Sequence, residues 1–149
     1  RLTCLARQGD FFELQDGAFI FADHIAPMQE WCVDPIAVAR DFIGAPYLWG
    51  GRESSGLDCS ALVQISLMQC GLACPRDSDM QEHVLGRSVD KAQSGDLVFW
   101  KGHVGLMSGD TTLLHANATS MDVREEDFDT VCARIAKTYG PVRAIKRPD

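Results

Sequence analysis

The sequence places one cysteine at the start of an expected helix. Cys59 follows Asp58 in the stretch GLDCSALVQISLMQCG, residues 56–71, whose apolar residues cover most of a helix and whose last glycine ends it. Asp58 predicts an N-cap, so the Cys59 thiol would lie at the positive end of the helix dipole. Such a position favours the thiolate and lowers the thiol pKa from its usual value of about 8.5. The sequence therefore indicates a nucleophilic cysteine.

A thiol nucleophile needs a base and a group that orients the base. His103 begins the strand-like run HVGLMS, and His115 lies near the end of the next run, TLLHAN. If these strands pair as a hairpin, both imidazoles lie near one end of it. His103 would then accept the thiol proton, and His115 would fix its tautomer through the other ring nitrogen. A zinc site made of Cys59 and the two histidines is the rival use of these side chains, but catalytic zinc more often has two closely spaced ligands on one element.

The elements that must position these residues predict an α+β fold, with helices before an antiparallel sheet. Asp34 and Pro35 mark the start of a helix that includes Ile43 on its apolar face and ends at Gly44, and a short helix is expected near residues 80–85. Strands are predicted in DLVFWK, HVGLMS, TLLHAN, MDVRE and PVRAIKR. The stretch EEDFDTVCARI fits either a short helix or a loop.

The N-terminal residues predict a separate β-segment. FFELQ and AFIFA flank Asp16 and Gly17, a dipeptide that indicates a tight hairpin between apolar runs. The chain opens within a strand-like run, so we expect this segment to be the end of a small barrel. The predicted division is a β-segment over residues 1–27 and a main domain over residues 28–149.

Composition and charge disfavour several classes of function. The net charge of −7 argues against binding to nucleic acid or to an anionic membrane, both of which need basic patches. Six cysteines at irregular spacings, in a chain with enough apolar residues for a core, predict reduced thiols and a cytoplasmic protein. We expect no metal and no cofactor. The cysteines other than Cys59 are expected to be small buried hydrophobes, namely Cys4, Cys32, Cys70, Cys74 and Cys132.

Four motifs, in their order along the chain, resemble one known family. PYLWGGRESSGLDCSALVQ, GDLVFW, HVGLMSGD and LLHANA are similar to motifs of the NlpC/p-sixty family of bacterial papain-like cysteine peptidases, which cleave cell-wall stem peptides. The resemblance extends from about residue 35 to residue 149. It implies a papain-like core, with a catalytic Cys59 at a helix N-terminus packed against an antiparallel sheet and with His103 and His115 completing a triad. It also implies that the Tyr47 hydroxyl lines the oxyanion hole beside the backbone N–H of Cys59. The remaining motif residues Trp49, Gly50, Gly51 and Asp96 are interpreted as structural, through packing, turns and a loop-fixing carboxylate.

The segment PRDSDMQ, residues 75–81, resembles a subgroup that acts on freed murein peptides. That subgroup releases a dipeptide from a substrate with an unblocked L-Ala next to γ-D-Glu. A free amine is a cation, so the groove should end at an anion, and the D-Glu carboxylate needs a cation such as an arginine. The candidates for substrate binding are Asp58, Ser60, Arg76, Asp77 and Ser78. Capping a helix is an equal alternative for Asp58 and Ser78, and a surface ion pair is one for Arg76.

The resemblance therefore implies a γ-D-glutamyl-L-diamino acid cysteine peptidase whose partner is a small murein peptide. The N-terminal strands resemble the end of a bacterial SH3-type domain, which in this subgroup can help to close the amine end of the groove. The alternatives are an exported endopeptidase that acts on intact wall in the periplasm or outside the cell, a non-catalytic wall-binding module, and acyl transfer to a lipid amine. The motifs leave open the oligomeric state and the choice between diaminopimelate and lysine in the third substrate position.

Overall fold

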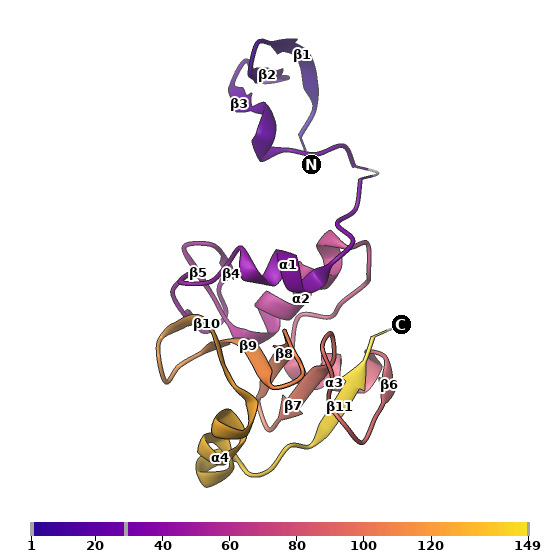
Figure 1. The fold of residues 1–149 in the computed structure, drawn as a ribbon. Coiled ribbons are helices and arrows are strands. Elements are labelled where there is room, and N and C mark those ends of the chain that lie inside the picture. Colours follow the sequence, from indigo (N-terminus) through magenta and orange to yellow (C-terminus); the bar gives the residue numbers. More distant parts are fainter. Residues whose placement is uncertain (1, 29, 149) are drawn as a thin grey trace. The chain divides into compact units, whose positions relative to one another are not determined.

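Residues 2–28 and 30–148 are described by the computed structural model (Figure 1). The chain divides into two compact units, Arg1–Trp31 and Cys32–Asp149. The sequence predicts this division after residue 27, whereas the first compact unit of the structure extends to Trp31. Each unit has a sheet of its own.

The first unit is a three-stranded antiparallel sheet in the order β1-β2-β3, followed by a single 3₁₀ turn. The predicted hairpin is confirmed, because Phe11 pairs with Phe21 and Phe12 with Ile20 across the turn at Gly17. None of the described residues of this unit is buried. The sheet therefore has no enclosed core within the described ranges. Its elements are β1 (Cys4–Gln8), β2 (Phe11–Leu14), β3 (Phe19–Phe21) and η1 (Ala22–His24).

Six strands of the second unit form one antiparallel sheet in the order β10-β9-β8-β7-β11-β6. The five strands predicted from residue 95 onward are all present in it, and a two-stranded ribbon of β4 and β5 lies outside it. These strands are β4 (Arg52–Glu53), β5 (Gly56–Leu57), β6 (Arg87–Ser88), β7 (Leu97–Trp100), β8 (His103–Met107), β9 (Thr112–Asn117), β10 (Asp122–Asp127) and β11 (Ala144–Arg147).

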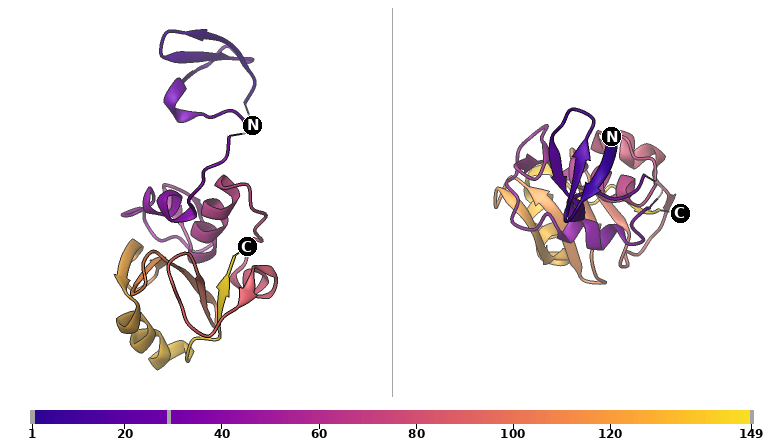
Figure 2. Two further views of the ribbon diagram at one scale, coloured as in Figure 1. Left: turned by 45° about the vertical axis from the view of Figure 1, so that its right-hand side comes forward. Right: turned by 90° about the horizontal axis from the view of Figure 1, so that it is seen from above.

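The helices of the second unit are α1 (Pro35–Arg40), α2 (Cys59–Gln69), α3 (Ser78–Val84) and α4 (Phe128–Tyr139). Figures 1 and 2 show α1 and α2 together on one side of the main sheet and α4 on the other. Helix α2 packs on α1, β8 and β9, whereas α4 packs on β9 and β10. In the part of the chain that the structure describes, no helix has the length and apolar composition needed to cross a membrane.

Strand β7 shows why the sheet is covered on both faces. Its residues alternate between two apolar clusters, with Leu97 and Phe99 in the cluster that includes α2 and Val98 and Trp100 in the cluster that includes α4. All four side chains are at most 1% exposed. A continuous apolar run without polar alternation is typical of a strand buried on both faces. The α+β fold predicted from the sequence, with helices packed on an antiparallel sheet, is confirmed.

The first helix of the second unit is shorter than the sequence predicts. Helix α1 ends at Arg40, and Ile43, which was expected on its apolar face, is 49% exposed. The backbone N–H groups of Phe42 and Ile43 bond to carbonyls only three residues back, those of Ala39 and Arg40. This tighter turn rotates Ile43 away from the core. Gly44, at a φ of 84°, ends the turn as predicted.

The stretch EEDFDTVCARI belongs to two elements instead of one. Residues 125–127 continue β10, where Glu125 pairs with Leu114 of β9. Asp127 then caps α4, because its side chain accepts a hydrogen bond from the Thr130 N–H at 2.9 Å. The sequence did not predict this end of the strand, because its three residues are acidic and acidic side chains are uncommon in strands.

The burial expected for five of the cysteines is wrong for Cys4 and Cys32 and only partly met by the others, of which Cys74 and Cys132 pack against the two apolar clusters. Cys4 and Cys32 are exposed and the other three are half-buried, whereas Cys59 is buried at 7% exposure. Cys4 lies in the sheet without an enclosed core, and Cys70 lies at the exposed C-terminal end of α2. Position in the fold therefore overrides the preference of cysteine for the interior. All six cysteines have free thiols in this structure.

Candidate active site

The N-terminus of α2 carries the candidate nucleophile. Asp58 has an extended backbone and its side chain accepts the N–H of Ala61 at 2.9 Å, so it is the N-cap that the sequence predicts. Cys59 is therefore the first residue of the helix, where backbone N–H groups have no acceptor within the helix. Helix α2 packs on strand β8, and Cys59 shares an apolar cluster with Val104, the residue after His103. Helix α2 and strand β8 thus bring the nucleophile to the base.

Burial dominates the electrostatics of the nucleophile. It raises the pKa of the Cys59 thiol to about 11, and the Asp58 carboxylate acts in the same direction. Hydrogen bonds from the backbone N–H groups of Val104, Ser60 and Cys59 oppose this rise and are outweighed. The lowered pKa expected from the helix dipole is therefore wrong for the free protein. The resting nucleophile is a thiol, because desolvating a thiolate costs more than the helix end returns.

The two histidines meet as the hairpin prediction requires. Strands β8 and β9 pair antiparallel, and His103 Nε2 lies 2.8 Å from His115 Nδ1. The Trp100 ring packs on His103 at a centroid distance of 5.7 Å. Burial lowers the pKa of His103 to about 3, with a smaller contribution from His115. His103 is therefore a neutral imidazole at neutral pH.

A carboxylate and a guanidinium that sequence reasoning missed lie behind His115. Glu126 Oε2 is 2.9 Å from His115 Nε2, and Arg134 donates to both Glu126 oxygens at 2.7 Å. His115 pairs with Arg124 across the β9–β10 ladder, so Glu126, two residues further on, is its diagonal neighbour. A strand assignment that continued through residue 126 would have found this contact. Both ring nitrogens of His115 are occupied, which disfavours the zinc alternative.

Tyr47 is placed beside the nucleophile. Its backbone N–H bonds to the Met121 carbonyl, and it bridges to Leu57 just before the N-cap of α2. Burial raises the pKa of the Tyr47 hydroxyl, and Cys59 is the next largest cause of the rise. The hydroxyl therefore stays protonated and can donate a hydrogen bond, which is what an oxyanion hole needs.

A pocket of about 400 Å³ opens at the thiol. All five predicted substrate-binding residues lie in its wall together with Cys59 and Tyr47. Trp49, interpreted from the sequence as a packing residue, is 85% exposed at this pocket, so that interpretation is wrong. Trp49 lies in the turn that leads into Gly50 and Gly51. The wall consists of Tyr47, Trp49, Gly50, Asp58, Cys59, Ser60, Arg76, Asp77, Ser78 and Gly102.

Asp58 and Arg76 bind each other in this pocket. Arg76 donates Nη1 to Asp58 Oδ1 at 2.9 Å and Nη2 to Oδ2 at 2.6 Å, and Nη1 also reaches the Ser60 hydroxyl at 2.9 Å. The Asp58 carboxylate further accepts from Gly50 N, Ser60 Oγ and Ala61 N. Its two oxygens are thus fully engaged by the protein, so Asp58 is a structural hub that holds Arg76. In the free protein, Asp58 therefore caps a helix and Arg76 forms an ion pair, which are the alternatives to substrate binding that the sequence offered.

Asp77 and Ser78 lie at the start of α3 and also line this pocket. Asp77 is the N-cap by backbone conformation, but its side chain makes no capping hydrogen bond. Ser78 is the first helical residue, so the capping alternative for Ser78 is wrong. The Asp77 carboxylate is therefore the acidic group of this wall that helix capping leaves open to a ligand.

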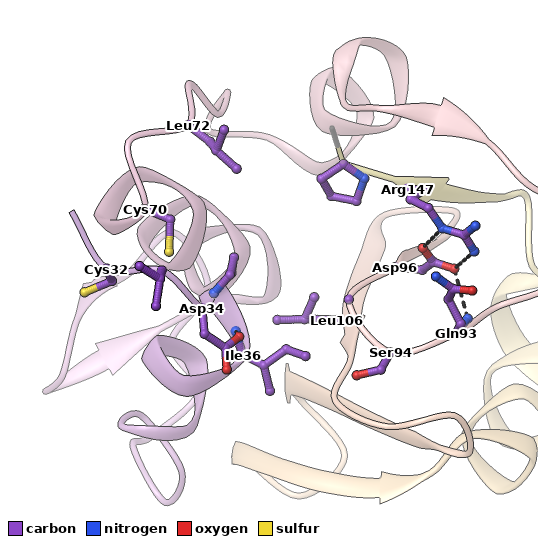
Figure 3. Close-up of a pocket in the computed structure, with 14 residues that line it drawn as sticks. Cys32, Asp34, Ile36, Cys70, Leu72, Gln93, Ser94, Asp96, Leu106 and Arg147 are labelled. Carbon is purple, nitrogen blue, oxygen red and sulfur yellow. Dashed lines mark hydrogen bonds and ion pairs between the residues drawn. The ribbon is translucent and has the colours of Figure 1, made fainter.

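A second hollow, of about 500 Å³, lies away from the triad (Figure 3). Cys32 and Cys70 lie on one side of it, and Asp96 and Arg147 form a two-pronged ion pair at 2.8 Å on the other. Asp96 also accepts the Gln93 N–H at 2.9 Å, which is the loop-fixing role that the sequence predicts. Neither the nucleophile nor the histidines line this hollow.

Comparison with known proteins agrees with this arrangement. Residues 44–139 match the sequence model of the NlpC/P60 family. The chain belongs to this family. An NlpC/P60 family protein from Bacillus cereus has the same fold, with a TM-score of 0.74 at 24% identity over 99% of this chain and 53% of that one.

Two curated proteins illustrate the range of similarity to this NlpC/P60 chain. It is 31% identical over 110 residues to Dipeptidyl-peptidase 6 of Lysinibacillus sphaericus, covering 72% of the chain and 41% of that relative. It is 35% identical over 99 residues to the Gamma-D-glutamyl-L-lysine dipeptidyl-peptidase of Bacillus subtilis, covering 60% of the chain and 33% of that relative. The chain thus spans less than half the length of these two relatives.

Proposed function

We propose that this protein is a cysteine peptidase that hydrolyses the bond after γ-D-Glu in murein stem peptides and releases L-Ala-γ-D-Glu from peptides with a free amine. The observation that carries the proposal is that Cys59 begins α2, which packs on β8, and that His103 of β8 is hydrogen-bonded to His115. Membership of the NlpC/P60 family supports it. The names of the two dipeptidyl-peptidase relatives support the finer specificity.

The geometry supports a thioester mechanism. Cys59 Sγ attacks the γ-carbonyl carbon of D-Glu while the thiol proton moves to His103. The oxyanion that forms accepts hydrogen bonds from the Cys59 N–H and the Tyr47 hydroxyl. The C–N bond then breaks, and His103 returns the proton to the leaving amine. Water, deprotonated by His103, cleaves the thioester, releases the new carboxylate and restores the thiol.

Substrate recognition follows from charge. The ammonium group of an unblocked L-Ala is a cation, and Asp77 is the anion in the pocket wall that helix capping does not occupy. The free D-Glu carboxylate suits the edge of Arg76, whose guanidinium is already oriented by Asp58. An N-acetyl group would remove the charge that we expect Asp77 to bind.

The test is hydrolysis of L-Ala-γ-D-Glu-diaminopimelate and its lysine analogue, each with a free and with an acetylated N-terminus, followed by mass spectrometry. We expect L-Ala-γ-D-Glu from the free peptides and little product from the acetylated ones. C59A should abolish turnover, whereas C70A, which changes a half-buried cysteine outside the pocket wall, should not. Turnover by C59A would refute the mechanism. Equal rates on blocked and free peptides would indicate an endopeptidase instead.

A further inference from the structure

Glu126 lies between an imidazole and a guanidinium. Its Oε2 is 2.9 Å from His115 Nε2, and the Arg134 fork reaches both of its oxygens at 2.7 Å. Arg134, with a smaller contribution from His115, lowers the pKa of Glu126 to about 2. Glu126 is therefore ionised at neutral pH, and an ionised carboxylate can only accept hydrogen bonds. The proton in this contact must be on His115 Nε2.

The position of that proton fixes two others. Burial lowers the pKa of His115, so its ring is neutral and carries a single proton, on Nε2. His115 Nδ1 is then an acceptor, and at 2.8 Å it takes the Nε2–H of His103. His103, also neutral, is left with a bare Nδ1. Nδ1 is the ring nitrogen that His115 does not engage, and Cys59 packs in the same apolar cluster as Val104, the residue after His103.

We propose that Glu126, held by Arg134, is a positioning residue that sets the tautomers of both histidines so that His103 presents an unprotonated Nδ1 to Cys59. The inference deepens the proposed function and rests on it. Glu126 touches neither the nucleophile nor the substrate and acts through His115. His115 keeps its proton throughout the reaction. Its part is to accept the Nε2–H of His103 while its own Nε2–H donates to Glu126.

Asn117 makes the role of Glu126 more specific. Its Nδ2 lies 3.3 Å from His115 Nε2, and its Oδ1 is occupied by Thr119 N, Ser120 N and Ser120 Oγ. The amide group that faces the ring is thus a donor, which favours a bare Nε2 on His115. That is the opposite tautomer, and it would place a proton on His103 Nδ1, where it blocks transfer from the thiol. The Glu126 carboxylate opposes this reversal.

The test is E126Q. Arg134 would hold the glutamine carbonyl, so the glutamine NH₂ would donate to His115 Nε2. The donor and acceptor in the hydrogen bond between His115 and His103 would then exchange. We expect ¹⁵N NMR of the histidine rings to show Nε2–H on His103 and His115 in the natural protein and Nδ1–H in E126Q. We expect kcat on the free-amine peptide to fall by about 100-fold or more with little change in KM, as when an orienting carboxylate is amidated in a serine triad. E125Q, a neighbour on β10 whose carboxylate pairs with Arg40, is the matched control and should match the natural protein.

E126D keeps an acceptor at this position and guards against simple loss of structure. It should retain the natural tautomers and a higher kcat than E126Q. The proposal is overturned if E126Q keeps the natural tautomers, if its kcat stays within about threefold of that of E125Q, or if E126D is no better than E126Q. The NMR measurement needs no substrate. Natural tautomers that reverse in E126Q, in a protein that cleaves no murein peptide, would therefore contradict the proposed function while confirming that Glu126 sets the tautomers.

Discussion

Among the residues of the site, Cys59 and His103 are both neutral at rest. Of the six cysteines, all within the described residues, Cys59 alone is buried. Burial raises the pKa of its thiol to about 11 and lowers the pKa of His103 to about 3, so neither group is charged near pH 7. Proton transfer then accompanies attack on the substrate and does not precede it.

The pH dependence of alkylation tests this neutral pair. In the free protein we expect the rate of Cys59 alkylation by iodoacetamide to rise about tenfold per pH unit between pH 7 and pH 10, because the thiolate fraction grows by that factor below the pKa. Mass spectrometry of the Cys59 peptide measures the rate, with C59A as the blank. A rate that has already reached a plateau at neutral pH would indicate a thiolate–imidazolium pair and contradict this expectation.

Among the elements, the glycine-rich loop before α2 determines where the nucleophile and Tyr47 lie. The loop doubles back as the β4–β5 ribbon, and Gly50 donates its N–H to Asp58 Oδ2 at 2.8 Å. A Cβ added at Gly51 would lie 2.3 Å from the Gly56 carbonyl oxygen, far inside any real contact. The two halves of the loop can approach this closely only because Gly51 has no side chain.

We therefore expect G51A to destabilise the protein by about 1–3 kcal/mol, the usual range for overpacking. It should also lower kcat, because the loop carries Tyr47 and supports Asp58. Chemical denaturation and peptide hydrolysis measure the two effects. G109A is the matched control, since a Cβ there meets only Thr112, at 3.6 Å, and Gly109 does not need a positive φ. Equal stability of the two variants would contradict the role given to Gly51.

At the scale of the whole molecule, the two units differ in how they hold together. The second unit has two apolar clusters, one on each face of its main sheet. The first has no buried residue among those described. The nucleophile, the base, the residues that orient the base and the pocket wall all come from the second unit.

Removal of residues 1–28 should therefore leave the second unit folded. We expect the same cooperative unfolding transition, at nearly the same denaturant midpoint, because the deletion takes away no residue of either apolar cluster. Circular dichroism during urea denaturation measures this, and the alkylation rate of Cys59 reports whether the site is intact. A lower midpoint or a lost transition would show that the second unit depends on the first.

The buried histidines predict how stability depends on pH. Burial lowers the pKa of His103 from 6.5 to about 3, and that of His115 is lowered too. Below pH 6.5 the unfolded chain binds protons that the folded protein does not, so stability is full above pH 6.5 and falls toward pH 3. His103 alone contributes up to about 1.4 kcal/mol per pH unit over this range. Urea denaturation at several pH values should show a smaller slope for H103Q and an unchanged slope for H83Q, which alters an exposed histidine. Equal slopes would contradict the assignment.

Local patterns in the sequence determined the nucleophile and the elements of the site. Asp58 before an apolar run predicts a capped helix with Cys59 at its start, and the runs that contain His103 and His115 predict adjacent strands; the structure contains all three elements. These features depend on neighbours within a few positions, through capping, side-chain periodicity and glycine turns. They can therefore be predicted without knowing what packs against what.

The tertiary structure alone decided the partners and the electrostatics of these residues. The pairing of Arg76 with Asp58 and the contact of Glu126 with His115 depend on loop paths and strand register, which bring distant positions together. The reversal of the expected Cys59 pKa has the same origin. A helix end is a local feature, whereas desolvation depends on everything packed around the thiol, and here the packing outweighs the helix end.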